Sequence, residues 1–555
     1  MSSQDAAPSR RDSPDHTLRD AGSIGSVTRD EKVAAPPPAS DPDTIVTGKK
    51  LAVAFVAMLL SQFLIALDQT ILATALPRIA SDFNSFTLQG WVATSFILAQ
   101  TVFLLLYGQI LRIYPSKWIL VSSIVIFEVG SLLCGVSQNV NQLIAGRTVS
   151  GLGAAGMFTA MFQVIAQVTR LEDRPRLFGL FGAVFALSSV IGPLIGGAFT
   201  DNVTWRWCFY INLPLGGVSI TGVVFLLKAA PPLGSDPTKR TRRDILQQTL
   251  HLDFLGAILV AAAVTSLVLA LQWGGNTKPW GDKDVIICFV FAGVLTAAYV
   301  WWEIYMGESA MTPTTIFKSR SVWAILAYCF LSRFSLLLFS YYIPIFYQAV
   351  RHHSATKSGI DLLPFMLGLV LTVILAGQIV GKTGYLWPFL FTAPFFLAVG
   401  SGLLYTLNTS SSSAKIVGFQ ILAGMGTGMG MQNSLLAMQV EFRDLPRLIA
   451  QATSMATFAQ FLGGTIGLGV AEPVRQRRSS RESPTAIYEA LPAAMIPGVV
   501  RSYSEALRIV FVVGVPVAGL ALFSAFFIKN LRIVKTAPPA AATKPNADAE
   551  KVAEA

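Results

Sequence analysis

Charged residues are scarce in this chain: they make up 13% of its 555 residues, whereas hydrophobic residues make up 53%. Soluble domains carry about 25% charged residues, so the composition excludes a soluble globular protein and predicts an integral membrane protein. The four cysteines lie far apart, in or beside apolar segments, and have no metal or redox spacing. Walker A, H-E-x-x-H and G-x-S-x-G sequences are also absent, which excludes transport driven by ATP on this chain and predicts that it is not an enzyme.

The net charge of +11 does not indicate nucleic-acid binding. The basic residues sit in short loops between apolar runs, which is the pattern of cytoplasmic loops facing anionic lipid. We therefore expect the lipid bilayer as a partner, and neither nucleic acid, metal nor any other cofactor.

Apolar runs long enough to cross a bilayer recur along the whole chain. They predict fourteen membrane-spanning helices, near 51–72, 89–110, 118–137, 141–166, 177–200, 206–228, 253–272, 284–304, 321–347, 359–380, 386–406, 416–440, 448–470 and 506–528. An even number of spans places both tails on one side of the membrane. Basic loops, such as the one with Arg170, Arg174 and Arg176, predict that this side is the cytoplasm.

Two N-x-[ST] sequons, at Asn202 and Asn408, fall in loops predicted to face outward. Asn202 lies close to the membrane, so Asn408 is the better candidate for glycosylation. One outward loop, 471–505, disagrees with the charge rule because it holds four arginines between Arg475 and Arg481. Long loops obey this rule less strictly, and we expect this one to lie along the surface as an amphipathic segment.

A repeat divides the chain into two similar parts. Gly151-Leu-Gly153 recurs as Gly424-Met-Gly426, and Gly192 and Gly196 recur as Gly463 and Gly467, at a nearly constant sequence distance. Parallel repeats of six helices are one of the layouts of secondary transporters, which bind substrate between the halves. The predicted domains are a disordered cytoplasmic tail (1–48), an N-terminal six-helix bundle (49–228), a basic connector with two linking helices (229–320), a C-terminal six-helix bundle (321–530) and a second disordered cytoplasmic tail (531–555).

The segment Gly182–Asp201 is apolar enough to span a bilayer but contains the helix breaker Pro193. Membrane helices keep such residues where neighbouring helices satisfy the freed backbone groups. Gly192 and Gly196 stand one turn apart and leave a smooth face for another helix. We predict a bend and a contact seam here.

Four motifs resemble the major facilitator superfamily, and specifically the fungal branch of its fourteen-spanner drug:proton antiporter family. They are Leu67-Asp68-Gln-Thr70-Ile71 with Ala75-Leu76-Pro77; Gly146-Arg147 with Gly151, Gly153 and Gly156; Gly192-Pro193-Leu-Ile-Gly196-Gly197; and Trp205-Arg206-Trp207 through Asn212-Leu213-Pro214. The resemblance implies an all-α membrane protein with the major facilitator fold, two six-helix bundles plus two central helices. It also identifies Gly182, Gly192, Pro193, Gly196 and Gly197 as the antiporter motif.

One loop departs from the superfamily pattern G-x-L-x-D-R-x-G-R-[RK]. It begins at Gly108, carries Arg112 at the acidic position and Pro115 in place of the second glycine, and keeps Lys117. We therefore expect a rewired contact between the two halves.

Four charged residues inside spans are candidates for proton coupling, because charges in a membrane are costly and usually functional. Asp68 carries the proton or caps a helix end, and Arg147 modulates that carboxylate or snorkels to the outer surface. Glu128 pairs with a basic group, joins a proton relay or makes a helix–helix hydrogen bond. Arg333 is a counter-charge in an acidic cavity or a substrate-facing cation. The residues alone leave these alternatives open.

Aromatic, sulfur-bearing and amide side chains in the spans are candidates to line a substrate cavity, because they bind flat amphipathic molecules adaptably. The candidates are Trp91, Phe158, Phe162, Gln163, Tyr341, Tyr342, Phe346, Met429, Met431, Gln432 and Asn433.

The resemblance and these residues predict a secondary transporter that exports an amphipathic small molecule, a fungal metabolite, toxin or drug, in exchange for protons. The alternatives are a proton-coupled importer of a nutrient or siderophore on the same fold and, less favoured, a non-transporting membrane sensor. The expected location is the plasma membrane, with a vacuolar or vesicle membrane as the alternative. Substrate identity, proton stoichiometry and oligomeric state are not determined by the sequence.

Overall fold

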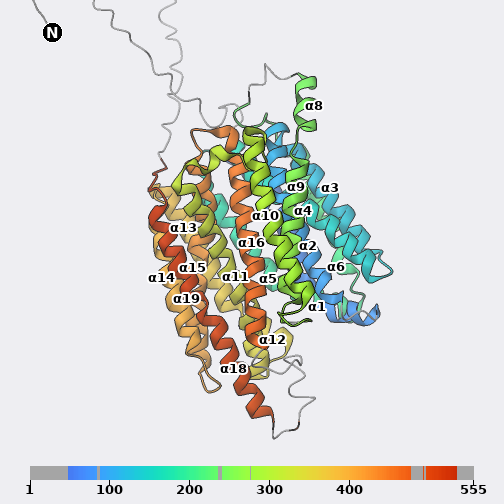
Figure 1. Cartoon of the computed structure of the whole chain (residues 1–555), viewed down its shortest axis with the longest axis vertical. Helices are drawn as coiled ribbons and strands as arrows, with labels where there is room; N and C mark the ends of the chain where they lie inside the picture. Colours follow the sequence, from blue (N-terminus) through green and yellow to red (C-terminus); the bar gives the residue numbers. More distant parts are fainter. Residues whose placement is uncertain are drawn as a thin grey trace, which may run out of the picture. The chain divides into compact units, whose positions relative to one another are not determined.

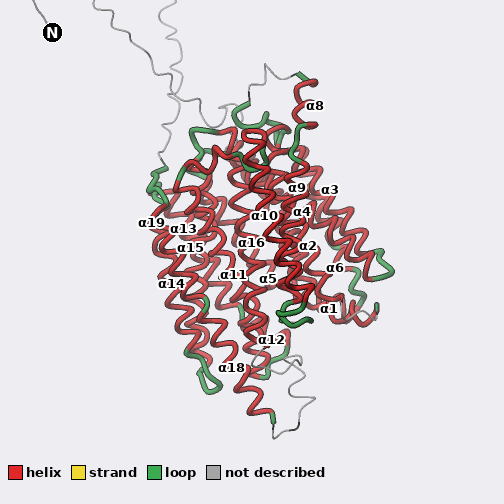
Figure 2. The backbone as a smooth tube through the Cα atoms, viewed as in Figure 1, coloured by secondary structure: helices red, strands yellow, loops and turns green. Residues whose placement is uncertain are grey.

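The computed structural model describes residues 48–83, 88–235, 241–275, 277–476, 492 and 495–533, which belong to one compact unit. The predicted tails, 1–48 and 531–555, lie outside these ranges except at their inner ends. The described residues form long helices and no strand, only two isolated bridges (Figure 2). The predicted all-α class is confirmed.

Seven helices make up the N-terminal half of the chain (Figure 1). They are α1 (Gly48–Asp82), α2 (Gln89–Ile113), α3 (Ser116–Gly135), α4 (Val140–Val168), α5 (Arg174–Asn202), the short α6 (Trp207–Tyr210) and α7 (Asn212–Leu226).

Three helices and two 3₁₀ turns connect the halves: α8 (Arg242–Leu250), α9 (Phe254–Trp273), α10 (Lys283–Met306), η4 (Gly307–Ser309) and η5 (Thr314–Lys318). The C-terminal half contains α11 (Arg320–Arg351), α12 (Ala355–Asp361), α13 (Leu363–Thr383), α14 (Trp387–Tyr405), α15 (Ser413–Glu441), η6 (Pro446–Leu448), α16 (Ile449–Gln476), α18 (Ile496–Val512) and α19 (Gly514–Phe527).

Within the described residues, twelve helical segments are long and apolar enough to cross a membrane. They correspond to the predicted spans except those near 416–440 and 448–470, which are α15 and α16. Both helices are long enough, and Figure 1 shows them running alongside the others, but they carry many polar side chains. The count of fourteen spans therefore stays a prediction. The last apolar segment, Ile496–Phe527, begins earlier than predicted. Apart from residues 492 and 495, the expected surface loop 471–505 is helix or lies outside the described residues.

Repeated glycines make equivalent contacts in the two halves. Replacing Gly151 of α4 by alanine would add a Cβ that clashes with the backbone of α2. The same change at Gly424 of α15 would bring a Cβ against the backbone of α13, 3.1 Å from Leu369 N. Likewise Gly153 packs against α3 and Gly426 against α14. The small residues that define the repeat are therefore the residues that let the same pairs of helices approach closely.

The connecting helix α9 lies against both halves, because it packs on α2 and on α16, and α10 packs on α9. The segment after α10 is held by the stretch that departs from the superfamily pattern, which the structure places largely in the C-terminal end of α2. Gln109 Nε2 of α2 donates to Ser309 O at 2.8 Å, and Arg112 donates to Gln451 Oε1 of α16 at 3.0 Å. Gln451 Nε2 in turn donates to the carbonyls of Ala310 and Met311, both at 3.2 Å. This amide-based junction joins α2, α16 and the connector where the superfamily places an acidic residue.

Candidate functional site

Asp68 and Arg147 form a buried ion pair. Arg147 Nη1 lies 2.5 Å from Asp68 Oδ2, and the side chains are 1% and 0% exposed. Arg147 Nε donates to Val92 O of α2 at 3.1 Å, and its guanidinium stacks over the Phe96 ring at 4.3 Å. The pair therefore joins α1, α2 and α4. The helix-cap alternative for Asp68 and the snorkelling alternative for Arg147 are both wrong, because α1 continues to Asp82 and neither side chain reaches the surface.

A polar chain extends from this pair to α7 and α3. Asn212 Nδ2 of α7 lies 3.5 Å from Asp68 Oδ1 and 3.1 Å from Ser131 Oγ of α3. Glu128 of α3 lies one helical turn from Ser131, and its buried side chain packs against Gly216 of α7. A Cβ added at Gly216 would lie 2.8 Å from Glu128 Cγ. Neither carboxyl oxygen of Glu128 has a hydrogen-bond partner among the described residues. The predicted pairing of Glu128 with a basic group and its predicted helix–helix hydrogen bond are therefore absent from the described part of the chain.

The antiporter motif on α5 packs against the stretch of α1 that carries Asp68. A Cβ on Gly192 would lie 2.8 Å from Thr70 Cβ, and one on Gly196 would lie 2.5 Å from Ile71 O. Thr70 Oγ1 donates a hydrogen bond to Ser188 O at 2.9 Å. The neighbouring carbonyl, that of Ser189, lacks its usual helical donor because Pro193 has no backbone N–H. The predicted contact seam is therefore present, and its partner is α1.

The other two glycines of the motif have different surroundings. A Cβ on Gly182 would lie 2.8 Å from Val373 Cγ1 of α13, so this glycine permits close packing between the halves. Gly197 has nothing within 4 Å of its Cβ position. Gly182, Gly192 and Gly196 thus allow α5 to pack closely against neighbouring helices, whereas Gly197 makes no such close contact.

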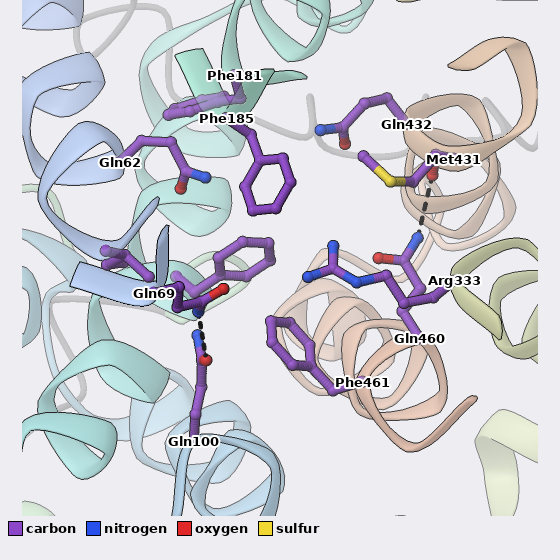
Figure 3. A pocket seen from close by; sticks show the side chains of 12 residues that line it. Gln62, Gln69, Gln100, Phe181, Phe185, Arg333, Met431, Gln432, Gln460 and Phe461 are labelled. Atoms are coloured by element: carbon purple, nitrogen blue, oxygen red, sulfur yellow. Dashed lines mark hydrogen bonds between the residues drawn. The ribbon is translucent and has the colours of Figure 1, made fainter. Parts of the chain in front are cut away.

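A narrow cavity lies between the two halves (Figure 3). It is lined by Gln62, Ile65, Gln69, Gln100, Phe158, Phe181, Phe185, Arg333, Met431, Gln432, Gln460 and Phe461, from α1, α2, α4, α5, α11, α15 and α16. Gln69 Nε2 donates to Gln100 Oε1 at 3.0 Å, and Gln460 Nε2 donates to Met431 O at 3.0 Å. Figure 3 shows the Arg333 guanidinium pointing into this space.

Three of the predicted lining residues, Phe158, Met431 and Gln432, lie on this cavity. The other candidates do not, because residue type alone does not say which face of a helix points inward. Tyr341 is 56% exposed on the surface of α11, and Tyr342 and Phe346 are buried in the C-terminal core. The remaining candidates do not line the cavity either. Trp91 is half-buried, and Phe162, Gln163, Met429 and Asn433 are buried.

Sequence reasoning missed four of the five glutamines that line the cavity: Gln62, Gln69, Gln100 and Gln460. Gln62 and Gln69 are seven residues apart, two turns, and share a face of α1. A glutamine in an otherwise apolar span is costly unless it has a partner or lines a cavity, and this signal is readable in the sequence.

The glycosylation candidates differ in local structure. Asn408 is exposed in the loop between α14 and α15, and its Oδ1 accepts hydrogen bonds from Ser410 and Ser411. Asn202 is exposed but is the last residue of α5, where its Nδ2 donates to Ala198 O at 3.0 Å. The arginines between Arg477 and Arg481 lie outside the described residues.

A bundle of long apolar helices, divided into similar halves around a shared cavity, defines a membrane transporter. The family model of the Major Facilitator Superfamily matches residues 58–468, and the chain belongs to this superfamily. It is therefore a multi-pass secondary transporter and not an enzyme.

Several fungal transporters are similar to this chain. The MFS-type transporter astH of Aspergillus oryzae is 38% identical over 500 residues, covering 87% of each chain. The efflux pump roqT of Penicillium rubens is 38% identical, over 84% of this chain and 88% of its own. The rubrofusarin-specific efflux pump aurT of Gibberella zeae is 37% identical, over 87% and 91%.

The fold also resembles a solved structure, that of the human organic anion transporter MFSD10 (TETRAN). The TM-score is 0.52 at 13% identity, over 87% of this chain and all of that one. This likeness supports the fold alone.

Proposed function

We propose that this chain exports an amphipathic small molecule, a fungal secondary metabolite, toxin or drug, in exchange for protons. The observation that carries the proposal is the buried Asp68–Arg147 ion pair beside the antiporter motif. Similarity to fungal efflux pumps supports the outward direction.

The ion pair offers a physical route from a proton to a movement. A proton on Asp68 removes the negative charge that balances Arg147, and an unbalanced charge in a dry interior costs several kcal/mol. The N-terminal helices must then adopt an arrangement in which Arg147 finds other acceptors. Because Gly192 and Gly196 hold α5 tightly against α1, a shift of α1 is transmitted to α5. Through Gly182, α5 transmits the shift to α13 in the other half.

Glu128 is the second proton carrier in this proposal. Its carboxyl oxygens are buried without hydrogen-bond partners among the described residues, one turn from the polar chain that leads to Asp68. We place the moving halves at 49–228 and 321–530, in the plasma membrane with both tails cytoplasmic.

Inside-out vesicles with an acidic lumen test the proposal. Three amphipathic fluorophores serve as probes: fluorescein as an anion, 7-amino-4-methylcoumarin as a neutral molecule and rhodamine 6G as a cation. An antiporter accumulates at least one probe against vesicles that lack the protein, and Asp68→Asn abolishes that accumulation with protein still in the membrane. Asp82→Asn, at the exposed end of the same helix, is the matched control and should transport normally.

Gradient-driven loss of a probe from the lumen would indicate the importer instead. Undiminished transport by Asp68→Asn would remove Asp68 from the coupling mechanism.

A further inference from the structure

The central cavity carries charge of one sign. Among its twelve lining residues, Arg333 is the one ionisable side chain, and the other polar side chains are five neutral glutamines. No carboxylate is part of the described lining. The alternative that Arg333 is a counter-charge in an acidic cavity is therefore not supported by the surroundings of Arg333.

Arg333 is buried and has no counter-ion among the described residues. It is 6% exposed, and Nε has no hydrogen-bond partner among the described residues. None of the ion pairs between described residues includes it. Its guanidinium lies instead over two aromatic rings, 4.8 Å from the centroid of Phe461 and 5.4 Å from that of Phe185.

Aromatic rings do not replace a counter-ion. A cation–π contact compensates a small part of the cost of removing a guanidinium from water, whereas an anion in hydrogen-bond contact compensates most of it. Figure 3 shows the guanidinium at the edge of open space, with Gln62 across that space on the side of the N-terminal half. The group that completes the electrostatics of this site therefore comes from the cavity.

We infer that the transported molecule is a flat aromatic carrying one carboxylate, and that Arg333 is the residue that binds the carboxylate. The inference rests on the proposed function, because it names the substrate class of that transporter. The planar guanidinium matches two carboxylate oxygens. The rings of Phe158, Phe181 and Phe185 supply walls for an aromatic body. A cationic substrate would meet the charge of Arg333 with no acidic group in the described lining to offset it.

Binding selectivity tests this inference without any gradient. Purified full-length protein in detergent at pH 7.5 is dialysed against radiolabelled 2-naphthoate, its neutral isostere 2-naphthamide, and naphthalen-2-ylmethylammonium. We expect naphthoate to bind at least about tenfold more tightly than naphthamide, as a charge-assisted bidentate contact predicts, and the ammonium to bind most weakly.

Three variants locate the preference. Arg333→Gln should bring the naphthoate and naphthamide Kd values within about twofold of each other while leaving the naphthamide Kd unchanged, and Arg333→Lys should keep part of the preference. Arg508→Gln removes a half-buried arginine of α18 that contacts Tyr405 and lies outside the cavity lining, so it controls for total charge and should retain the full preference.

Several results would overturn the inference: no naphthoate binding, naphthamide or the ammonium binding at least as tightly as naphthoate, or a full preference in Arg333→Gln. Equal loss of both naphthalene ligands in folded Arg333→Gln and Arg333→Lys would show a structural role. Asp68→Asn should keep the naphthoate preference. Failure of proton coupling and failure of carboxylate selectivity are thus separate observations.

Discussion

In the N-terminal half, α4 is joined to α1 by the Arg147–Asp68 ion pair. In the C-terminal half, the corresponding helix α15 is joined to α11 by a neutral hydrogen bond, from Gln420 Nε2 to Tyr347 Oη at 2.9 Å. Gln420 precedes Gly424 by four residues, as Arg147 precedes Gly151, and both links are buried.

The difference indicates which half carries the titratable link that the proposed proton coupling requires. An amide and a phenol keep the same charge through neutral pH, whereas a carboxylate that pairs with a guanidinium changes the charge of the site when it binds a proton. Glycine packing is shared by the halves, but the link between α4 and α1 carries charge, whereas the equivalent link between α15 and α11 is neutral. The C-terminal half supplies Arg333 to the cavity instead.

The largest expected effect comes from making the N-terminal link resemble the C-terminal one. The double variant Asp68→Asn/Arg147→Gln removes both charges together, so no buried charge is left unpaired. We expect a folded protein whose gradient-driven probe accumulation falls to the level of protein-free vesicles. Gln420→Leu, the matched change in the other half, should retain coupling; equal losses in both variants would contradict the comparison.

Stability should show the same asymmetry. Asp68→Ala leaves Arg147 buried and unpaired, which costs about 3–5 kcal/mol of unfolding free energy, whereas Gln420→Ala leaves a phenol unpaired at about 1–3 kcal/mol. Thermal unfolding in detergent measures both. If adding Arg147→Ala to Asp68→Ala restored none of the lost unfolding free energy, the unpaired Arg147 would not be the cause of the destabilisation.

The shared glycine seam predicts losses in both halves. Gly463→Ala places a Cβ 2.7 Å from the carbonyl carbon of Phe330, a backbone atom, and Gly192→Ala places one against Thr70. We expect each to cost about 1–3 kcal/mol, and Gly463→Ala to cost more because backbone moves less easily than a side chain. Gly197→Ala has open space and should be neutral in the same melting assay.

A smaller effect is expected at the junction between the halves. Gln451→Leu removes the acceptor of Arg112 and two donations to the connector, each worth about 1 kcal/mol. The transport rate should change while the naphthoate Kd stays constant, since Gln451 lies outside the cavity lining. An unchanged rate, measured in the vesicle assay, would show that this junction does not limit the movement.

The smallest change concerns the two sequons. Asn408 is exposed in a loop, whereas Asn202 is helical, so a glycan is expected on Asn408 alone. Asn408→Gln should abolish the gel shift caused by glycan removal, and Asn202→Gln should not. The opposite pattern would reverse this assignment.

Much of the fold could be read from the sequence, because apolar runs and glycine spacing report on local helix formation and close packing. The seam at Gly192 and Gly196 was predicted from their one-turn spacing, and the structure supplied α1 as its partner. The domain boundaries and the count of fourteen spans stay predictions. In α15 and α16 the hydropathy signal is weak because both helices carry many polar side chains along their length.

Composition, periodicity and charge distribution by themselves determined that this chain is an all-α membrane protein with a repeated core, because these are local properties that a bilayer selects directly. The expectation of transport came from the motifs that resemble the major facilitator superfamily. Tertiary structure alone decided which charges meet. Asp68 and Arg147 are brought together from two helices, and Arg333 is left without a described counter-ion. The rotation of each helix about its axis, set by packing against its neighbours, places a side chain in a cavity, in a core or at the surface, and residue type does not encode it.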